Sequence, residues 1–194
     1  SWVGFANYEN LLFQDAVFWE TLGNTFFFVA ILVPGILLLS FTFAVLVNTP
    51  SPLSKVVTVA YFLPFVIPLA ATGLVWRWIF NGEYGVMNYV LSLVGANGPS
   101  WLVDRSWVKP AIIVAQMTLI GQYFVIFVAK LQDIPKSLYE SADLDGASPL
   151  QKTLHITVPM VSPAILFNLV TCFIIIFQLF EIPYIMTFEG GGGA

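Results

Sequence analysis

The fold class of this chain is decided by Thr25–Val47, which reads TFFFVAILVPGILLLSFTFAVLV. The stretch carries no charged side chain, and 16 of its residues are Leu, Ile, Val or Phe. At roughly −0.3 to −0.6 kcal/mol for each, these residues favour insertion into a bilayer by on the order of 5 to 10 kcal/mol. Because about 20 apolar residues are enough to cross the hydrocarbon core, the sequence predicts a membrane-spanning helix here.

Three more stretches, Val56–Trp76, Pro110–Ala129 and Val158–Phe180, are apolar and uncharged over similar lengths. The whole chain is 58% hydrophobic and 9% charged, whereas a soluble domain has about 25% charged residues. The sequence therefore predicts an all-α fold, a polytopic membrane helix bundle that forms a single transmembrane domain over residues 1–194. We expect spans at about residues 25–47, 56–80, 108–130 and 158–182, with kinks at their internal prolines.

The connections between these spans differ in polarity. Residues 1–23 and 81–107 are rich in Trp and Tyr, which favour membrane interfaces, whereas residues 131–157 are polar and charged. Four lysines fall on the side of residues 131–157, and three basic residues, Arg77, Arg105 and Lys109, fall on the other. This small excess favours a cytoplasmic position for residues 131–157 and an external one for the other two segments.

The polar segment has the pattern of two short helices. Asp133 is placed to cap a first helix over Lys136–Leu144, and Gly146 allows the turn that ends it. A second helix is expected over Pro149–Ile156, with Ser148 before it. Four residues at helical spacing would share one face of the first helix: Leu138, Ser141, Ala142 and Asp145. Such a segment either shields the bundle or docks into a groove on a partner protein.

The same segment carries a family resemblance. Leu131–Ala147 (LQDIPKSLYESADLDGA), followed by Ile156–Pro159 (ITVP) and Pro163, resembles the EAA loop of binding-protein-dependent ABC importer permeases. Glu140–Ala142 occupies the Glu-Ala-Ala positions, with Ser in place of the first Ala, and Asp145–Ala147 matches the Asp-Gly-Ala that follows. The resemblance extends over some thirty residues and is anchored at both ends.

Other segments resemble the sugar-importer branch of this MetI-like superfamily, and within it the MalF- or UgpA-type subunit. They are Val3–Tyr8, Tyr61–Pro68, Trp76–Phe80, Gly85–Asn88 and Phe177–Gly192. Compared with the six-span core of that family, the first and last spans are missing. The resemblance therefore implies a MetI-like permease core that is present here as a fragment.

The resemblance also implies a mechanism. Lys136–Leu144 would be a cytoplasmic coupling helix that docks into a separate ATPase. The residues implied in coupling are Leu138, Glu140, Ser141, Ala142, Leu144, Asp145 and Gly146. The implied partners are a pair of cytoplasmic ATP-binding subunits, a second homologous permease subunit forming a heterodimer, an extracytoplasmic solute-binding protein and the lipid bilayer. The chain would be a multi-pass translocation subunit of a bacterial plasma (inner) membrane, importing a sugar or a related polyol or glycerol-phosphate-like solute.

The residue inventory argues against other chemistry. The sequence lacks the G-x-x-x-x-G-K-[ST] phosphate loop, so ATP hydrolysis is expected in a separate subunit. One histidine, His155, and one cysteine, Cys172, cannot supply a tetrahedral metal site of nitrogen and sulfur ligands. The seven Lys and Arg residues are scattered, which disfavours nucleic-acid binding. We therefore predict no catalytic residue, no metal and no cofactor.

Polar residues inside the spans are candidates for the solute path. Thr171 and Gln178 lie seven residues apart and share one helical face, with Asn168 close to Thr171 in angle. Gln116 and Tyr123 share a face of the preceding span in the same way. Their amide and hydroxyl groups either contact sugar hydroxyls or hydrogen-bond neighbouring helices.

Two alternative classes of protein compete with an importer permease. An ion-coupled secondary transporter usually carries ionisable residues at membrane depth, and the four apolar stretches contain none. A membrane anchor with no transport role would leave the patterned segment 131–157 without a purpose. ATP-driven import is therefore the preferred hypothesis.

Overall fold

The computed structural model describes residues 4–48 and 52–188, without the side chains of residues 52, 53 and 55. Over this part of the chain every regular element is a helix, which confirms the predicted all-α fold. Val3 and residues 189–192, which carry part of the family resemblance, lie outside the described residues. In chain order the elements are α1 (Ala6–Phe13), α2 (Ala16–Val47), α3 (Pro52–Val66), α4 (Leu69–Ile79), α5 (Val86–Leu93), α6 (Arg105–Met117), α7 (Gly121–Gln132), α8 (Lys136–Leu144), α9 (Pro149–Lys152), the π-helical turn η1 (Thr153–Thr157), α10 (Val158–Met160), α11 (Ser162–Phe177) and α12 (Glu181–Thr187).

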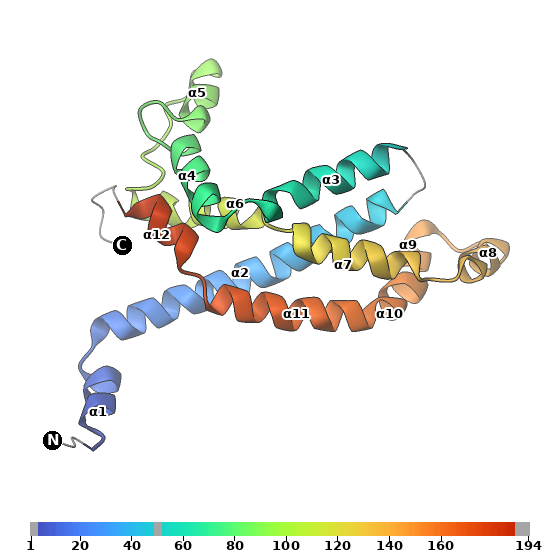
Figure 1. The fold of residues 1–194 in the computed structure, drawn as a ribbon, viewed down its shortest axis with the longest axis horizontal. Coiled ribbons are helices and arrows are strands. Elements are labelled where there is room, and N and C mark those ends of the chain that lie inside the picture. The colour runs from blue at the N-terminus through green and yellow to red at the C-terminus, as the bar shows by residue number, and fades with distance from the viewer. Residues whose placement is uncertain (1–3, 49–51, 189–194) are drawn as a thin grey trace.

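The helices form an elongated bundle with different structures at its two ends (Figure 1). α2 packs against both α7 and α11, and α3 packs against α7. α4 and α5 stand at one end, where α12 packs against α4. α8 and α9 lie at the opposite end, so residues 81–107 and 131–157 are kept apart by the length of the bundle (Figure 1).

α2 is the central helix, and its start is fixed by a side-chain cap. Asp15 Oδ1 accepts hydrogen bonds from the N–H groups of Val17 at 2.9 Å and Phe18 at 3.1 Å. The helix has 32 residues, which at 1.5 Å per residue makes it roughly 48 Å long, more than the ~30 Å hydrocarbon core. The predicted span 25–47 lies wholly inside it, but the helix begins at Ala16 because the Asp15 cap is there. Pro34 lies within this helix without ending it.

Each of the other three predicted spans is interrupted by a bend between helices, and in the last of them α11 ends at Phe177, short of the predicted boundary at 182, while the helical run before the bend begins at Pro149. The axes of α3 and α4 differ by 101°, those of α6 and α7 by 40°, and those of Pro149–Met160 and α11 by 69°. Among the described residues, α2 alone is long and apolar enough to cross a membrane unbroken. Counting each bent pair as one span raises the number to as many as four, by length and composition.

The bends have local causes. Pro68 precedes α4 in an extended conformation (φ −54°, ψ 137°) and has no N–H to continue α3. The α6–α7 break is covered by Thr118, whose hydroxyl donates to the Ala115 carbonyl at 2.6 Å and accepts from Trp76 Nε1 at 3.3 Å. Pro163 stands in the first turn of α11, where a missing N–H is tolerated.

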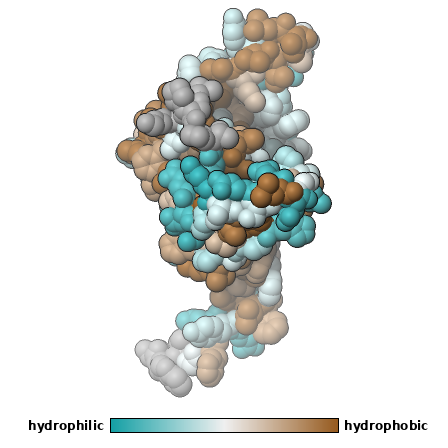
Figure 2. All heavy atoms as spheres, turned by 90° about the vertical axis from the view of Figure 1, so that its right-hand side faces the viewer, coloured by the Kyte–Doolittle hydropathy of each residue, from teal (hydrophilic) through white to brown (hydrophobic). Residues whose placement is uncertain are grey.

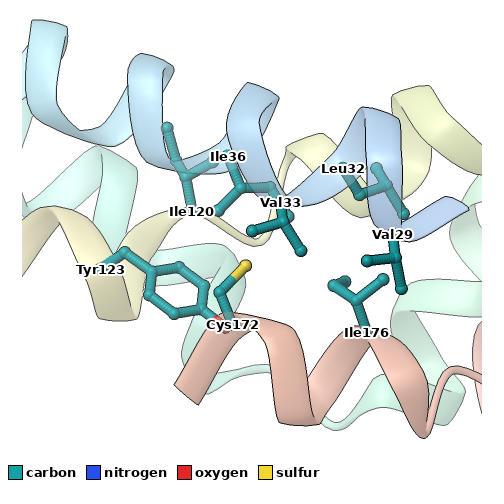
Figure 3. Close-up of a cluster of buried hydrophobic side chains, with 8 residues drawn as sticks. All are labelled: Val29, Leu32, Val33, Ile36, Ile120, Tyr123, Cys172 and Ile176. Atoms are coloured by element: carbon teal, nitrogen blue, oxygen red, sulfur yellow. The ribbon is translucent and has the colours of Figure 1, made fainter. Parts of the chain in front are cut away.

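A buried apolar cluster joins α2, α7 and α11 (Figure 3). Its buried residues are Val29, Leu32, Val33 and Ile36 of α2, Ile120 and Tyr123 at the start of α7, and Cys172 and Ile176 of α11. The four α2 residues recur at i, i+3, i+4 and i+7, so one face of that helix turns inward. The outward residues of α2 and α11 are large and apolar as well, with Leu38 66% and Phe167 55% exposed, as contact with lipid requires.

The end that carries α8 and α9 is polar. Viewed from that end, hydrophilic residues gather over the tip of the bundle, and hydrophobic surface lies above and below them (Figure 2). A polar tip on an apolar bundle is the arrangement expected when the tip stands in water and the bundle in lipid.

Gly121 permits the close approach of α3 and α7. A Cβ atom there would lie 2.6 Å from the Tyr61 carbonyl oxygen, which belongs to the α3 backbone and cannot turn away. We expect Gly121→Ala to separate the two helices and to lower the thermal unfolding temperature of the purified protein in detergent. The expected loss is about 1–3 kcal/mol, the usual effect of overpacking.

Gly23→Ala is the matched control for this substitution, because a Cβ at Gly23, in the exposed part of α2, would meet nothing within 4 Å. That variant should unfold at the same temperature or slightly higher, since alanine favours a helix over glycine by up to about 1 kcal/mol. Equal unfolding temperatures for the two variants would contradict the α3–α7 contact.

Candidate functional site

The polar tip begins with α8, whose start differs from the sequence-based expectation. α8 follows Pro135, and no side chain caps it. The prediction that Asp133 caps this helix is wrong. Asp133 is instead the C-cap residue of α7, and its Oδ2 lies 3.4 Å from Lys130 Nζ. Ile134, which separates Asp133 from Pro135, is buried in the core, so the Asp133 carboxylate stays on the α7 side.

The end of α8 agrees with the sequence. Gly146 has φ +74°, a left-handed conformation that glycine adopts without strain. Its N–H donates to the Asp143 carbonyl at 3.1 Å, and the next N–H donates to the Ala142 carbonyl at 2.9 Å. Ser148 and Gln151 then form a reciprocal capping box that starts α9. The turn between the two helices is therefore closed by its own hydrogen bonds.

The residues predicted to couple to an ATPase lie on the outside of this tip. Leu144 is 91% exposed and Leu138 is 40% exposed. Ala142 is half-buried. The remaining four coupling residues are exposed: Glu140, Ser141, Asp145 and Gly146. Two leucines beside a carboxylate on a short exposed helix suit insertion into a groove on another protein.

An open hollow of about 360 Å³ lies beside α8 on the side of α9 and η1. Its walls include Ala142, Asp145 and Gly146 from the α8 side and His155 and Ile156 from η1. Because Ala and Gly have little or no side chain, another molecule can approach the backbone here closely. The hollow brings three of the predicted coupling residues together.

The inner face of α8 carries two residues that the sequence did not single out. The Tyr139 hydroxyl lies 2.9 Å from Thr157 Oγ1, and Asp143 forms an ion pair with Lys152. Tyr139 and Asp143 are four residues apart, and this spacing was the available signal that they share a face. Their partners were not foreseeable, because a π-helical turn sets the register of Lys152 and Thr157.

The candidate solute-path residues are mostly inside the bundle. Gln116, Tyr123 and Asn168 are 6%, 4% and 0% exposed. Asn168 Nδ2 donates to the Tyr123 carbonyl at 3.2 Å, so these two residues meet across the α7–α11 contact. Asn168 Oδ1 is buried and has no hydrogen-bond partner among the described residues.

The other two candidates lie further along α11. Thr171 is half-buried, and its hydroxyl bonds back to the Phe167 carbonyl at 2.9 Å. Gln178 caps the end of the helix and is exposed. The structure therefore brings Tyr123 and Asn168 together, and leaves Gln178 away from them at the end of α11.

The opposite end of the bundle is organised by Asn88 of α5. Its Nδ2 donates to the Gly82 carbonyl at 2.8 Å, and its Oδ1 accepts from Trp101 Nε1 at 2.6 Å. Trp101 packs on Phe80, which stacks on Trp76, with ring centroids 5.6 and 5.3 Å apart. This chain of aromatic contacts fixes the predicted external segment 81–107 onto α4.

Comparison with known proteins identifies the class to which this bundle belongs. A family model described as the binding-protein-dependent transport system inner membrane component matches residues 36–194. The chain belongs to this family.

Similar proteins within the family are permeases of transport systems. The chain is 38% identical to the sulfoquinovosyl glycerol transport system permease protein SmoG of Agrobacterium fabrum over 98% of its own length and 61% of that protein. It is 35% identical to the lactose transport system permease protein LacF of Rhizobium radiobacter, over 94% of the chain and 62% of the relative. The chain thus spans about 60% of the length of these relatives.

A solved structure shares the fold. A chain of a bacterial ABC transporter involved in the import of the acidic polysaccharide alginate superposes with a TM-score of 0.81. The match covers 95% of this chain and 68% of the other, at 24% sequence identity. The predicted MetI-like permease fold is therefore confirmed.

Asn168 offers a test of how the α7–α11 contact is satisfied. Asn168→Leu removes one hydrogen bond, worth about 0.6 kcal/mol within a membrane, and also removes an unpaired buried oxygen whose cost is about 1–3 kcal/mol. Because leucine has a similar size, we expect the thermal unfolding temperature of the variant to be unchanged or higher. A clear fall in that temperature would show that Oδ1 has a partner in the complete protein.

Proposed function

We propose that the chain is the core of a permease subunit in an ATP-driven importer of a sugar or a related polyol or glycerol-phosphate-like solute. The observation that carries the proposal is the exposed α8 tip on a bundle of the binding-protein-dependent transport family. α8 docks into a cytoplasmic ATPase, and a second ATPase subunit and a second, homologous permease subunit complete the assembly. An extracytoplasmic solute-binding protein delivers the solute at the other end.

The relatives support the choice of solute. The names of the similar permeases include lactose, trehalose/maltose and arabinooligosaccharides, all of them sugars. The fold match belongs to an importer of alginate, and one of its structures contains a periplasmic protein bound to an alginate pentasaccharide. A carbohydrate is therefore the solute class that these similarities favour for this chain.

The two ends of the bundle support an orientation. The bundle spans a bacterial inner membrane. The polar α8 tip lies in the cytoplasm, and the segment held by Asn88 and Trp101 lies on the external side. Closure of the ATPase pair on ATP displaces α8, and the bends between α3 and α4 and before α11 are places where the spans can change angle. Access to the solute path then alternates between the two sides.

Gln116, Tyr123, Asn168, Thr171 and Gln178 are the candidate residues of that path. Thr171 and Gln178 are the two whose side chains another molecule can reach in this conformation. The three buried residues become available only when α7 and α11 separate. Alternating access supplies such a separation, so all five are proposed as contacts that form at different stages.

Coupling through α8 is tested with two substitutions in the full-length parent protein. The protein is reconstituted with its ATPase, partner permease and binding protein, with lactose, maltose and glycerol 3-phosphate offered as solutes. Gly146→Ala forces alanine into the left-handed region, at a cost of about 1–2 kcal/mol, and Glu140→Ala removes the carboxylate of α8. We expect each change to lower ATP hydrolysis stimulated by the solute-loaded binding protein, Gly146→Ala by roughly five- to thirtyfold, the factor that corresponds to about 1–2 kcal/mol.

Gly95→Ala is the matched control. Gly95 has φ +77°, and a Cβ there would meet nothing within 4 Å, as at Gly146. It suffers the same backbone strain but lies in the external segment, so stimulated hydrolysis should stay close to the unsubstituted rate. Full rates of hydrolysis and uptake in both α8 variants would contradict the coupling role of α8.

A further inference from the structure

We propose that α8 and η1 move as one rigid unit, and that this unit passes a displacement of α8 to α11 through Tyr139, Thr157 and Val161. The proposal rests on the coupling role proposed for α8 and adds the residues that connect it to the bundle. They are positioning residues. Tyr139 lies on the inner face of α8, away from the face offered to an ATPase, and Thr157 and Val161 lie between α8 and α11 in η1 and directly before α11.

The first observation is the π-helical turn itself. The N–H of Val158 donates to the Thr153 carbonyl, five residues back. Pro159 supplies the cause, because in an α-helix its ring would meet the carbonyl of His155, four residues earlier. Widening the turn by one residue relieves this contact, so the proline fixes the place of the π-turn directly before it.

The second observation is the register that this turn creates. In an α-helix, residues five apart such as Lys152 and Thr157 would point about 140° apart. Here both side chains reach α8: Thr157 Oγ1 lies 2.9 Å from the Tyr139 hydroxyl, and Lys152 forms an ion pair with Asp143. Tyr139 and Asp143 share one face of α8.

The hydrogen bond between the Tyr139 and Thr157 hydroxyls is largely shielded from water. Either hydroxyl can be the donor at 2.9 Å, because each carries one proton and can also accept. Thr157 Oγ1 also lies 3.4 Å from the Lys152 carbonyl oxygen. Thr157 is 4% exposed, and the Tyr139 ring packs against the apolar cluster that contains Ile134 and Val161. Little water competes for this hydrogen bond, so it holds α8 firmly.

The ion pair between Asp143 and Lys152 adds a second point of attachment. The Asp143 side chain is 63% exposed, so the pair contributes little energy by itself. Its position matters more, because it lies one turn along α8 from Tyr139. Two attachments on one face prevent α8 from rotating about the Tyr139 hydrogen bond.

A short run of main-chain hydrogen bonds continues from η1 into α11. The Thr157 carbonyl accepts from the Val161 N–H at 3.0 Å, and the Val161 carbonyl accepts from the Ile165 N–H of α11 at 3.0 Å. Val161 is fully buried and stands at the 69° bend between Pro149–Met160 and α11. Movement of the unit therefore reaches α11 at its first turn.

The test measures hydrogen–deuterium exchange on the full-length protein assembled with its ATPase, with and without MgATP. Tyr139→Phe and Thr157→Val should each raise exchange of the 153–158 amides about fivefold, the factor that corresponds to a hydrogen bond of about 1 kcal/mol. In both variants MgATP should still change exchange in α8 but no longer in α11. The amount of ATPase that co-purifies should be unchanged.

Matched controls separate this effect from general damage. Thr153→Val removes a hydroxyl of the same π-turn that donates to the Pro149 carbonyl of α9 and not to α8. Tyr89→Phe removes an exposed phenol at the other end of the bundle. Neither should alter hydrogen–deuterium exchange in residues 153–158.

The ion pair is tested by reversing its charges. Asp143→Lys and Lys152→Asp should each raise hydrogen–deuterium exchange in residues 153–158, and the double variant, in which the two charges are swapped, should return that exchange toward the original value.

The outcomes distinguish this proposal from the proposed function. If α11 responds to MgATP in Tyr139→Phe and Thr157→Val as it does in the original protein, the rigid unit is overturned while ATPase docking stands. If no ATPase co-purifies with the original protein and Gly146→Ala behaves like Gly95→Ala, the proposed function fails. In that case, hydrogen–deuterium exchange in residues 153–158 that is raised in Tyr139→Phe and Thr157→Val would still support the attachment of α8 to η1. Exchange that is unchanged in these two variants would overturn that attachment.

Discussion

No water is available inside a bilayer to main-chain N–H and C=O groups, so every interruption of a helix there must be covered by protein. Three of the four apolar segments of this chain are interrupted, and the structure depends on how those interruptions are covered. Thr118 and Trp76 cover the break between α6 and α7 with side-chain hydrogen bonds. At the bend before α11 the Val161 N–H donates to the Thr157 carbonyl and the Val161 carbonyl accepts from the Ile165 N–H, both at 3.0 Å, so the main chain there stays paired.

The same constraint explains what was predictable from the sequence. The all-α fold and the position of the central span follow from hydropathy, which depends on residue type alone. Gly146 and Ser148 were recognised because their roles are local. The 101° bend between α3 and α4 was not predicted, because prolines within membrane spans produce bends of any size, and packing decides which.

The misplaced cap at Asp133 has a similar cause. An aspartate two residues before a proline is a plausible cap in isolation, but the burial of Ile134 between them turns its carboxylate toward α7. The attachment of α8 through Tyr139 and Thr157 depends on the register of a π-turn, which sequence periodicity does not reveal. For the coupling residues the family resemblance supplied the proposed roles, and in the structure all of them except Ala142 are exposed, on α8 and in the turn that follows it.

The central claim is that α8 is the cytoplasmic contact with an ATPase. It is tested most directly by cross-linking a single cysteine at position 144, whose leucine is 91% exposed, in a Cys172→Ala background. Position 94 in the external segment, where Val94 is 77% exposed, serves as the comparison. We expect Leu144→Cys to cross-link to the ATPase subunit and to react with a membrane-impermeant maleimide only in inverted vesicles, and Val94→Cys to do neither. Labelling of Leu144→Cys from outside right-side-out vesicles, without a cross-link, would contradict a cytoplasmic contact between α8 and an ATPase.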